Sequence, residues 1–224
     1  MLHVTGTGHN VLTFSHPYQY VRFAIHYSHN YILTPNTQTD DKIRCKWCVG
    51  DPLYEKYHDE EWGRPVYDDQ KLFEFLILET FQAGLSWITI LRKRENFRMA
   101  FDNFDYKNVA KYDEQKIGEL MNDAGIIRNQ LKIRAAVSNA QAFMKVQDEF
   151  GTFSNYIWKF TGGTPIRNDV KTMSDIPATT PLSDAISKDL KKRGFKFVGS
   201  TVIYAHMQAT GMVNDHIADC WKSA

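Results

Sequence analysis

The spacing of apolar residues constrains this chain most, because from Arg44 onward it follows the helical repeat almost throughout. No pair of alternating apolar and polar runs brackets a hairpin turn, so nothing indicates an antiparallel sheet. The expected fold class is therefore all-α. The expected helices span 68–81, 87–101, 109–120, 130–150, 153–160, 183–193 and 200–211, a turn-rich surface connection covers 162–183, and a short helical turn ends the chain.

The chain divides by composition into an extension, residues 1–43, and a helical domain, residues 44–222. The extension holds five of the eight histidines, which are His3, His9, His16, His26 and His29. Their spacing fits no metal-ligand template, so we interpret the extension as an appendage of unknown role.

Composition excludes several classes of protein. A chain of 224 residues is long enough to bury roughly 70% of its unfolded surface. No apolar run reaches the roughly 18 residues of a membrane-spanning helix. Three cysteines, an odd number, disfavour a disulfide framework and predict reduced thiols in a cytoplasmic protein. The net charge of +1 means that nucleic-acid binding must depend on local clusters of bases.

Thiols and imidazoles lie near both ends of the helical domain. Cys45 and His58 stand at its start and His216 and Cys220 at its end. His216 and Cys220 are four residues apart, so on a helix they share one face. Two thiolates and two imidazoles form the donor set of a closed, structural zinc site. Cys48 is a rival ligand, because it forms a C-x-x-C pair with Cys45, and ordinary core thiols with surface histidines are the remaining alternative.

A carboxylate stands on an apolar helix face. Glu79 follows Leu72 by seven residues and Phe75 by four, whereas Glu74 is expected to point outward into solvent. A buried carboxylate is costly unless it is paired or hydrogen-bonded, so Glu79 predicts a polar pocket. The alternative is a carboxylate that accepts hydrogen bonds from a nearby loop backbone.

Aromatic residues gather on both sides of this helix in the sequence. They are Trp47, Tyr54, Tyr57 and Trp62 before it and Trp87 after it. Aromatic faces attract cations and stack on bases, so with Glu79 they would suit a cationic, planar ligand. The alternative is that they are ordinary core residues.

A short glycine-containing turn, 123–128, joins two expected helices. Its backbone N–H groups, with Arg128 and Lys132 nearby, suit a phosphate. Bases also cluster at 92–94 and over 188–196, although such runs are most often solvated faces.

Several long motifs together resemble 3-methyladenine DNA glycosylase I, the constitutive helix-hairpin-helix family. They are RCKWC, DPLYEKYHDEEWG, LETFQAGLSWITIL, DAGIIRNQLKI, LKKRGFKFVGSTVIYAHMQATGMVNDH and the terminal Cys220. The resemblance runs from about Arg44 to Trp221 and implies an all-helical base-excision repair enzyme whose two ends are joined by one structural zinc. It implies the ligands Cys45, His58, His216 and Cys220, with Cys48 as a bystander.

The resemblance also implies the residues that act on DNA. It implies that Glu79 is the catalytic residue and that Tyr54, Tyr57, Trp87 and Trp47 bind the base. Gly84 and Leu85 match the tip inserted into the DNA stack, and the hairpin contacts DNA through Gly125, Ile127, Arg128 and Lys132. The implied function is a monomeric, monofunctional enzyme that flips 3-methyladenine out of alkylated double-stranded DNA and hydrolyses it, leaving an abasic site.

Two other functions stay open. A non-catalytic, zinc-containing DNA-binding module would not need Glu79 beside Trp87. A glycosylase for oxidised or mismatched bases would need an aspartate or lysine catalyst, and no motif places a lysine in the pocket.

Overall fold

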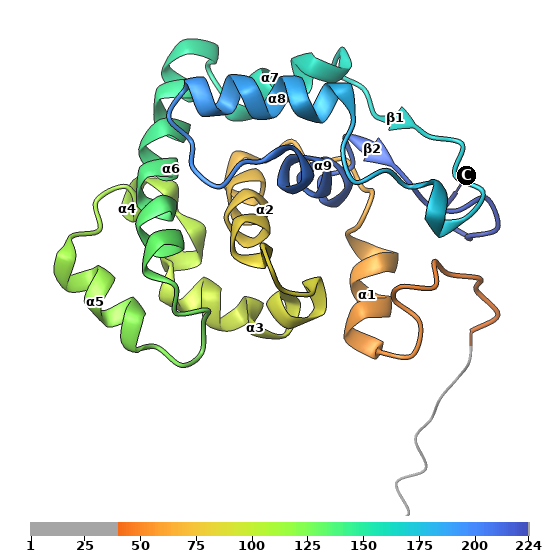
Figure 1. The fold of residues 1–224 in the computed structure, drawn as a ribbon, viewed down its shortest axis with the longest axis horizontal. Helices are drawn as coiled ribbons and strands as arrows, with labels where there is room; N and C mark the ends of the chain where they lie inside the picture. Colours follow the sequence, from red (N-terminus) through yellow and green to blue (C-terminus); the bar gives the residue numbers. More distant parts are fainter. Residues whose placement is uncertain (1–39, 224) are drawn as a thin grey trace, which may run out of the picture. The chain divides into compact units, whose positions relative to one another are not determined.

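The computed structural model describes residues 40–223, so the five histidines of the extension, from His3 to His29, lie outside the described residues. The described part is predominantly helical, as expected (Figure 1). Its α-helices are α1 (Pro52–Glu60), α2 (Asp69–Gln82), α3 (Trp87–Ala100), α4 (Tyr106–Val109), α5 (Glu114–Asn122), α6 (Gln130–Phe150), α7 (Phe153–Trp158), α8 (Pro181–Lys192) and α9 (Ser200–Ala209). Three 3-10 turns, η1 (Asp102–Phe104), η2 (Lys159–Thr161) and η3 (Met173–Asp175), lie between them.

Side-chain caps determine where most of these helices begin. The Asp68 carboxylate accepts a hydrogen bond from the Lys71 amide at the start of α2. Asp113 caps α5 in the same way. Thr180 begins α8 with a reciprocal capping box to Ser183. These side chains satisfy N–H groups that have no partner inside the helix, which explains why the start of α2 could be predicted from the sequence.

Helix α2 forms the centre of the domain and is buried on every side beyond its first turn. It packs against α3, α6, α7 and α9, which surround it in Figure 1. A helix that is apolar all round belongs in a core, so any polar group on α2 lies in a cavity or is paired.

The structure differs from the sequence expectation at three places before the last segment of the chain. It did not include α1, whose first turn begins at Pro52 with Asp51 as the cap. The single helix expected over 109–120 is two helices, α4 and α5. Two short strands, β1 (Ile166–Arg167) and β2 (Val213–Asn214), pair in parallel, the first inside the expected surface connection and the second just after the helix expected over 200–211. A parallel pair joins distant segments, so no local alternation announces it.

The end of the chain is also different from the expectation. Residues 215–217 are irregular and 218–222 form turns and a bend, not a helix, so His216 and Cys220 do not share a helical face. The prediction from their spacing was wrong because β2 extends the chain just before His216.

Gly211 brings the end of α9 against the segment that follows α1. A Cβ atom there would lie 2.3 Å from the Arg64 carbonyl carbon, and its φ is +68°, so only glycine suits the position. The Gly63 amide donates to the Gln208 carbonyl at 3.0 Å across the same contact. The close approach places α1 and α9 on opposite sides of one cavity. Within 40–223, no helix combines the length and apolarity needed to cross a bilayer.

Candidate active site and metal centre

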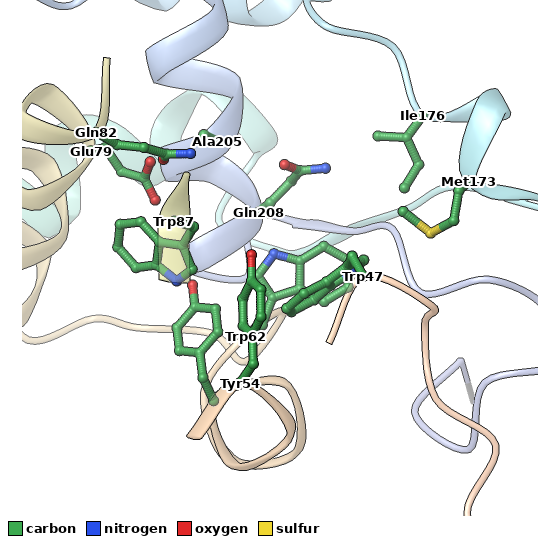
Figure 2. Close-up of a pocket in the computed structure, with 11 residues that line it drawn as sticks. Trp47, Tyr54, Trp62, Glu79, Gln82, Trp87, Met173, Ile176, Ala205 and Gln208 are labelled. Carbon is green, nitrogen blue, oxygen red and sulfur yellow. The ribbon is translucent and has the colours of Figure 1, made fainter. Parts of the chain in front are cut away.

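A cavity of about 190 Å³ opens between α1, the C-terminal end of α2, helix α9 and the η3 segment. Figure 2 shows aromatic rings along one side of the cavity and carboxyl and amide groups along the other. It is lined by Trp47, Tyr54, Tyr57, Trp62, Glu79, Gln82, Trp87, Met173, Ile176, Ala205 and Gln208. The structure therefore brings the predicted Glu79 together with all five aromatic residues grouped from the sequence.

Glu79 is buried at this cavity without compensation from the protein. Its side chain belongs to a residue only 4% exposed, and its Oε2 atom has no hydrogen-bond partner among the described residues. No backbone N–H of residues 40–223 donates to the carboxyl group. This disfavours the alternative in which Glu79 accepts hydrogen bonds from a nearby loop backbone. Burial raises the pKa of Glu79 to about 8. The cavity therefore contains a carboxyl group whose ionised form is stabilised only when a donor or a cation enters.

Trp87 supplies a second unsatisfied group at the same end of the cavity (Figure 2). Its indole Nε1 is buried and has no acceptor among the described residues. Its ring lies 5.4 Å from that of Tyr57, centroid to centroid, and Trp47 contacts Tyr54 edge-on at 4.7 Å. Buried indole N–H groups generally find a partner. The cavity thus combines aromatic faces, one free donor and one free carboxyl.

Glu74 is not solvated, contrary to the expectation from the helix face. It is 6% exposed, and its Oε1 accepts from Arg94 Nε at 2.6 Å and from Arg98 Nη2 at 2.8 Å. Burial favours a higher pKa, but the charges of Arg94, Lys71 and Arg98 hold the pKa of Glu74 below its usual value. The face opposite Glu79 meets α3 and not solvent, because α2 is central.

The turn between α2 and α3 forms an exposed tip. Leu85 is 41% exposed, and Gly84 has a φ of +85°. A second cavity of about 250 Å³ runs from Glu79 to Leu85 and is bounded on the other side by Thr201 and Val202 of α9. The tip is therefore continuous with the cavity that contains Glu79.

Lys132 supports this tip from inside the protein. Its Nζ donates to the carbonyl oxygens of Phe81 at 3.0 Å and Ala83 at 2.7 Å, and the residue is only 7% exposed. The expectation that Lys132 is a free base beside a phosphate does not fit this geometry. The ammonium group instead satisfies carbonyls at the C-terminal end of α2, where a positive charge is favourable.

The turn between α5 and α6 uses some of its polar groups internally. The Gly125 amide donates to Asp123 Oδ1 at 2.7 Å, and Lys93 Nζ donates to the Ala124 and Gly125 carbonyls at 3.1 Å. Arg128 is exposed, and in the described part of the chain no acceptor contacts the amides of Ile127 and Arg128. Gly125 shapes the turn, and Ile127 and Arg128 present free donors beside the start of α6.

Two segments far apart in the chain meet in a buried cluster. One ligand atom from each of Cys45, His58 and Cys220 lies within 4.8 Å of the others, a group that could hold a metal ion. His58 Nδ1 also contacts Asp59 Oδ1 at 2.8 Å, the outer contact usual for a metal-binding imidazole. Cys48 is buried, and its Sγ donates to the Cys45 carbonyl oxygen at 3.1 Å.

His216 lies beside this cluster, outside the three-residue group. Its ring is 4.9 Å from the His58 ring, centroid to centroid, and Asn214 Oδ1 contacts its Nδ1 at 2.7 Å. Its Nε2 is buried without a partner, and burial lowers the pKa of His216 to about 3. The imidazole is therefore neutral and retains a free nitrogen.

A sequence profile of methyladenine glycosylases matches residues 47–223, which include the cavity and most of the metal cluster. The chain belongs to the methyladenine glycosylase family. DNA-3-methyladenine glycosylase 1 of Escherichia coli (strain K12) is 50% identical over 177 residues, which are 79% of this chain and 95% of that protein. DNA-3-methyladenine glycosylase of Haemophilus influenzae is 48% identical, over 79% of this chain and 96% of its own length.

Solved structures of this family share the fold. A crystal structure of 3-methyladenine DNA glycosylase I superimposes with a TM-score of 0.79 at 48% identity, covering 80% of this chain and 99% of that one. A Staphylococcus aureus structure, described as the basis of 3-methyladenine recognition by that enzyme, has a TM-score of 0.78 at 36% identity and covers 81% and 96%.

Sequence reasoning missed one half of the glycosylase cavity. The missed lining residues are Gln82, Met173, Ile176, Ala205 and Gln208. Gln82 stands three residues after Glu79 and shares its helix face, so its place in the cavity could have been predicted from the sequence. The other four come from the η3 segment and α9, and nothing in their local sequence relates them to α2.

Proposed function

We propose that this member of the family hydrolyses 3-methyladenine from alkylated double-stranded DNA and leaves an abasic site. The observation that carries the proposal is that one aromatic cavity contains two buried groups without a hydrogen-bond partner, Glu79 Oε2 and Trp87 Nε1. Such groups are costly unless a ligand completes them.

The chemistry of the substrate explains this cavity. Methylation at N3 leaves adenine positively charged while it is still attached to its sugar, so the glycosidic bond is weakened and the base is a good leaving group. A flipped base of this kind stacks between aromatic faces and donates from its exocyclic amine to Glu79. Neutral adenine gains much less, because it lacks the charge that the Glu79 carboxylate and the rings attract.

Glu79 also has the properties needed for the hydrolytic step. Arrival of the cationic base favours the ionised carboxylate and reverses the effect of burial on its pKa. Its negative charge then stabilises the oxocarbenium character that develops at the sugar as water attacks the anomeric carbon. The cationic base leaves as neutral 3-methyladenine, so no acid is needed to protonate it.

The exposed tip would enter the duplex. Leu85 would fill the space left by the flipped nucleotide, and the cavity between Leu85 and Glu79 would admit the base. Lys132 keeps the tip in place through the Ala83 carbonyl.

Phosphate contacts would flank this tip. The free amides of Ile127 and Arg128 and the Arg128 side chain lie at the start of α6, and the start of α9 has no side-chain cap at Gly199. Helix N-termini attract phosphate without reading sequence. Exposed lysines next to α9 add charge, namely Lys188, Lys191, Lys192 and Lys196.

We also propose that the buried cluster binds one structural zinc through Cys45, His58, His216 and Cys220. The donor set suits tetrahedral zinc, and the unpartnered His216 Nε2 is the kind of orphaned atom that a metal would satisfy. The metal would supply no chemistry to the base, because all four positions are filled by protein. Its effect would be to hold the two ends of the domain together.

Release of free base from methylated DNA tests the catalytic proposal. The protein is incubated with DNA treated with a methylating agent, and the supernatant is analysed by chromatography. We expect 3-methyladenine in the supernatant and abasic sites in the DNA. Binding to DNA without any released base would favour the non-catalytic module, and release of oxidised or mismatched bases would favour a different glycosylase.

A further inference from the structure

Gln208 lines the base cavity from α9, opposite the aromatic residues. Its Nε2 donates to Asp215 Oδ2 at 2.7 Å. In Figure 2 its amide oxygen lies on the side of Glu79 and its amide nitrogen on the opposite side. In the described part of the chain the oxygen has no donor, so a hydrogen-bond acceptor faces the cavity.

Asp215 makes this orientation obligatory. It is 1% exposed and accepts three hydrogen bonds, from Gln208 Nε2, from Tyr204 Oη at 2.7 Å and from Asn168 Nδ2 at 2.6 Å. A reversed Gln208 amide would place its oxygen against a carboxylate oxygen, and two acceptors repel. Burial and then the bond to Asp215 raise the pKa of Tyr204, so its hydroxyl keeps the proton that it donates.

Three separate elements hold Asp215 itself in place. Asn168 follows β1, Tyr204 belongs to α9, and Asp215 follows β2, with the Asn168 amide bonded to the Asn214 carbonyl at 3.2 Å. The parallel strand pair therefore carries the carboxylate that orients Gln208. This gives a reason for the only strand pair in residues 40–223 to lie beside the cavity.

Glu79 and Gln208 Oε1 are thus two acceptors that line the cavity, beside the unsatisfied donor Trp87 Nε1. Adenine carries an amine donor at position 6, where guanine carries a carbonyl acceptor. The amine has two N–H groups, so it can donate to both acceptors. A carbonyl oxygen facing Gln208 Oε1 would leave both oxygens unpaired, which a buried site tolerates poorly.

We propose that Gln208 reads the exocyclic amine of the flipped base through Oε1, and that Asp215 is the positioning residue that holds the amide in this orientation. The inference rests on the proposed function and adds to it a determinant of base choice between 3-methyladenine and 3-methylguanine.

The test uses the full chain and DNA that has been treated with N-methyl-N-nitrosourea. The treated DNA carries both 3-methyladenine and 3-methylguanine. Single-turnover release of each base is measured for the parent, Gln208→Met and Asp215→Asn. Methionine keeps the length of glutamine but lacks its amide oxygen, and asparagine at 215 offers a donor that lets the Gln208 amide reverse. We expect each variant to release 3-methyladenine about tenfold more slowly, the value of one lost hydrogen bond. Release of 3-methylguanine should stay within about twofold for Gln208→Met and should not fall for Asp215→Asn.

Asp189→Asn is the matched control, because Asp189 also accepts from a tyrosine hydroxyl, Tyr156 Oη, at 2.7 Å. It should leave the ratio of the two released bases unchanged even if it lowers the melting temperature. All rates are measured below the melting temperature of the least stable variant. An equal fall for both bases in Asp215→Asn would show that Asp215 is merely structural.

Quenching of tryptophan fluorescence by free 3-methyladenine gives a readout that does not depend on turnover. We expect Gln208→Met to bind this base about tenfold more weakly than the parent. Unchanged quenching together with an unchanged ratio of released bases would overturn the inference. A parent protein that binds free 3-methyladenine but releases none from DNA would instead overturn the proposed function.

Discussion

The Nε2 atom of His58 lies 3.4 Å from the Sγ atom of Cys220, although 162 residues separate them in the chain. The contact joins the start of the helical domain to its end, with Cys45 in the same group. A bond at this point closes nearly the whole domain into one loop. A metal there would therefore act on the stability of the fold.

Replacement of Cys45 or Cys220 by serine should remove zinc and lower the melting temperature, since a structural zinc contributes folding free energy directly. Cys48→Ser should retain about one zinc per chain, because a hydroxyl can still donate to the Cys45 carbonyl. Elemental analysis and thermal melts of the purified variants measure both effects. Loss of zinc from Cys48→Ser with full zinc in His58→Ala would show that the ligand set is wrong.

Glu79→Gln keeps the shape of the side chain and removes its charge. Excision of 3-methyladenine should fall by about 10- to 150-fold, the value of a charge-assisted hydrogen bond, while affinity for an abasic duplex should not change. Single-turnover release and a filter-binding titration measure the two quantities. Exposed Glu60 provides the control, as Glu60→Gln should match the parent in both. Equal excision by Glu79→Gln and the parent would mean that the carboxylate is structural.

The stability of the parent should fall with rising pH relative to Glu79→Gln. Burial raises the pKa of Glu79 from 4.5 to about 8, so between these values the folded state holds a proton that the unfolded state has lost. The stabilisation by that proton is complete below about pH 4.5 and is lost as the pH rises through about 8. Urea titrations at pH 5, 7 and 9 should show a difference on the order of a few kcal/mol. A difference independent of pH would place an unrecognised donor beside the carboxyl.

Glu74→Gln should destabilise the protein by about 1.5–3 kcal/mol, because the buried Arg94 loses one of its two carboxylate partners and keeps only Glu61. The sign of the pH effect is opposite to that of Glu79, since the pKa of Glu74 is lowered and its contribution is lost in acid. Glu95→Gln is the control, because exposed Glu95 pairs only with Arg98 among the described residues. Chemical unfolding at neutral and acidic pH separates the two variants. A Glu74→Gln protein as stable as the parent would contradict the burial of this cluster.

Arg128→Ala should weaken binding to an abasic duplex and reduce the slope of log affinity against log salt by about one. Lys107 is exposed on α4, and the control variant Lys107→Ala should leave the slope unchanged. Lys132→Met should act differently, lowering stability and excision while keeping the salt slope, because its ammonium is bonded to Phe81 and Ala83. A reduced slope for Lys132→Met would instead show that Lys132 contacts a phosphate.

The sequence by itself determined most of the helices and the unusual placement of Glu79. Both depend on residues within a few positions of each other, such as the Asp68 cap of α2 and the spacing from Leu72 to Glu79. The same local logic failed for Glu74, because the pattern of one helix does not reveal that a second helix covers its other face. Only the packing of α3 supplies Arg94 and makes the burial of Glu74 possible.

Tertiary structure alone decided the remaining parts of the site. Gln208 enters the cavity because Gly211 lets the end of α9 approach Arg64, and its amide is oriented by an aspartate that a strand pair brings into place. His216 reaches His58 from an extended segment where the spacing had indicated a helix. These relationships join residues far apart in the chain, and their free energy depends on burial and close approach, which local periodicity does not encode.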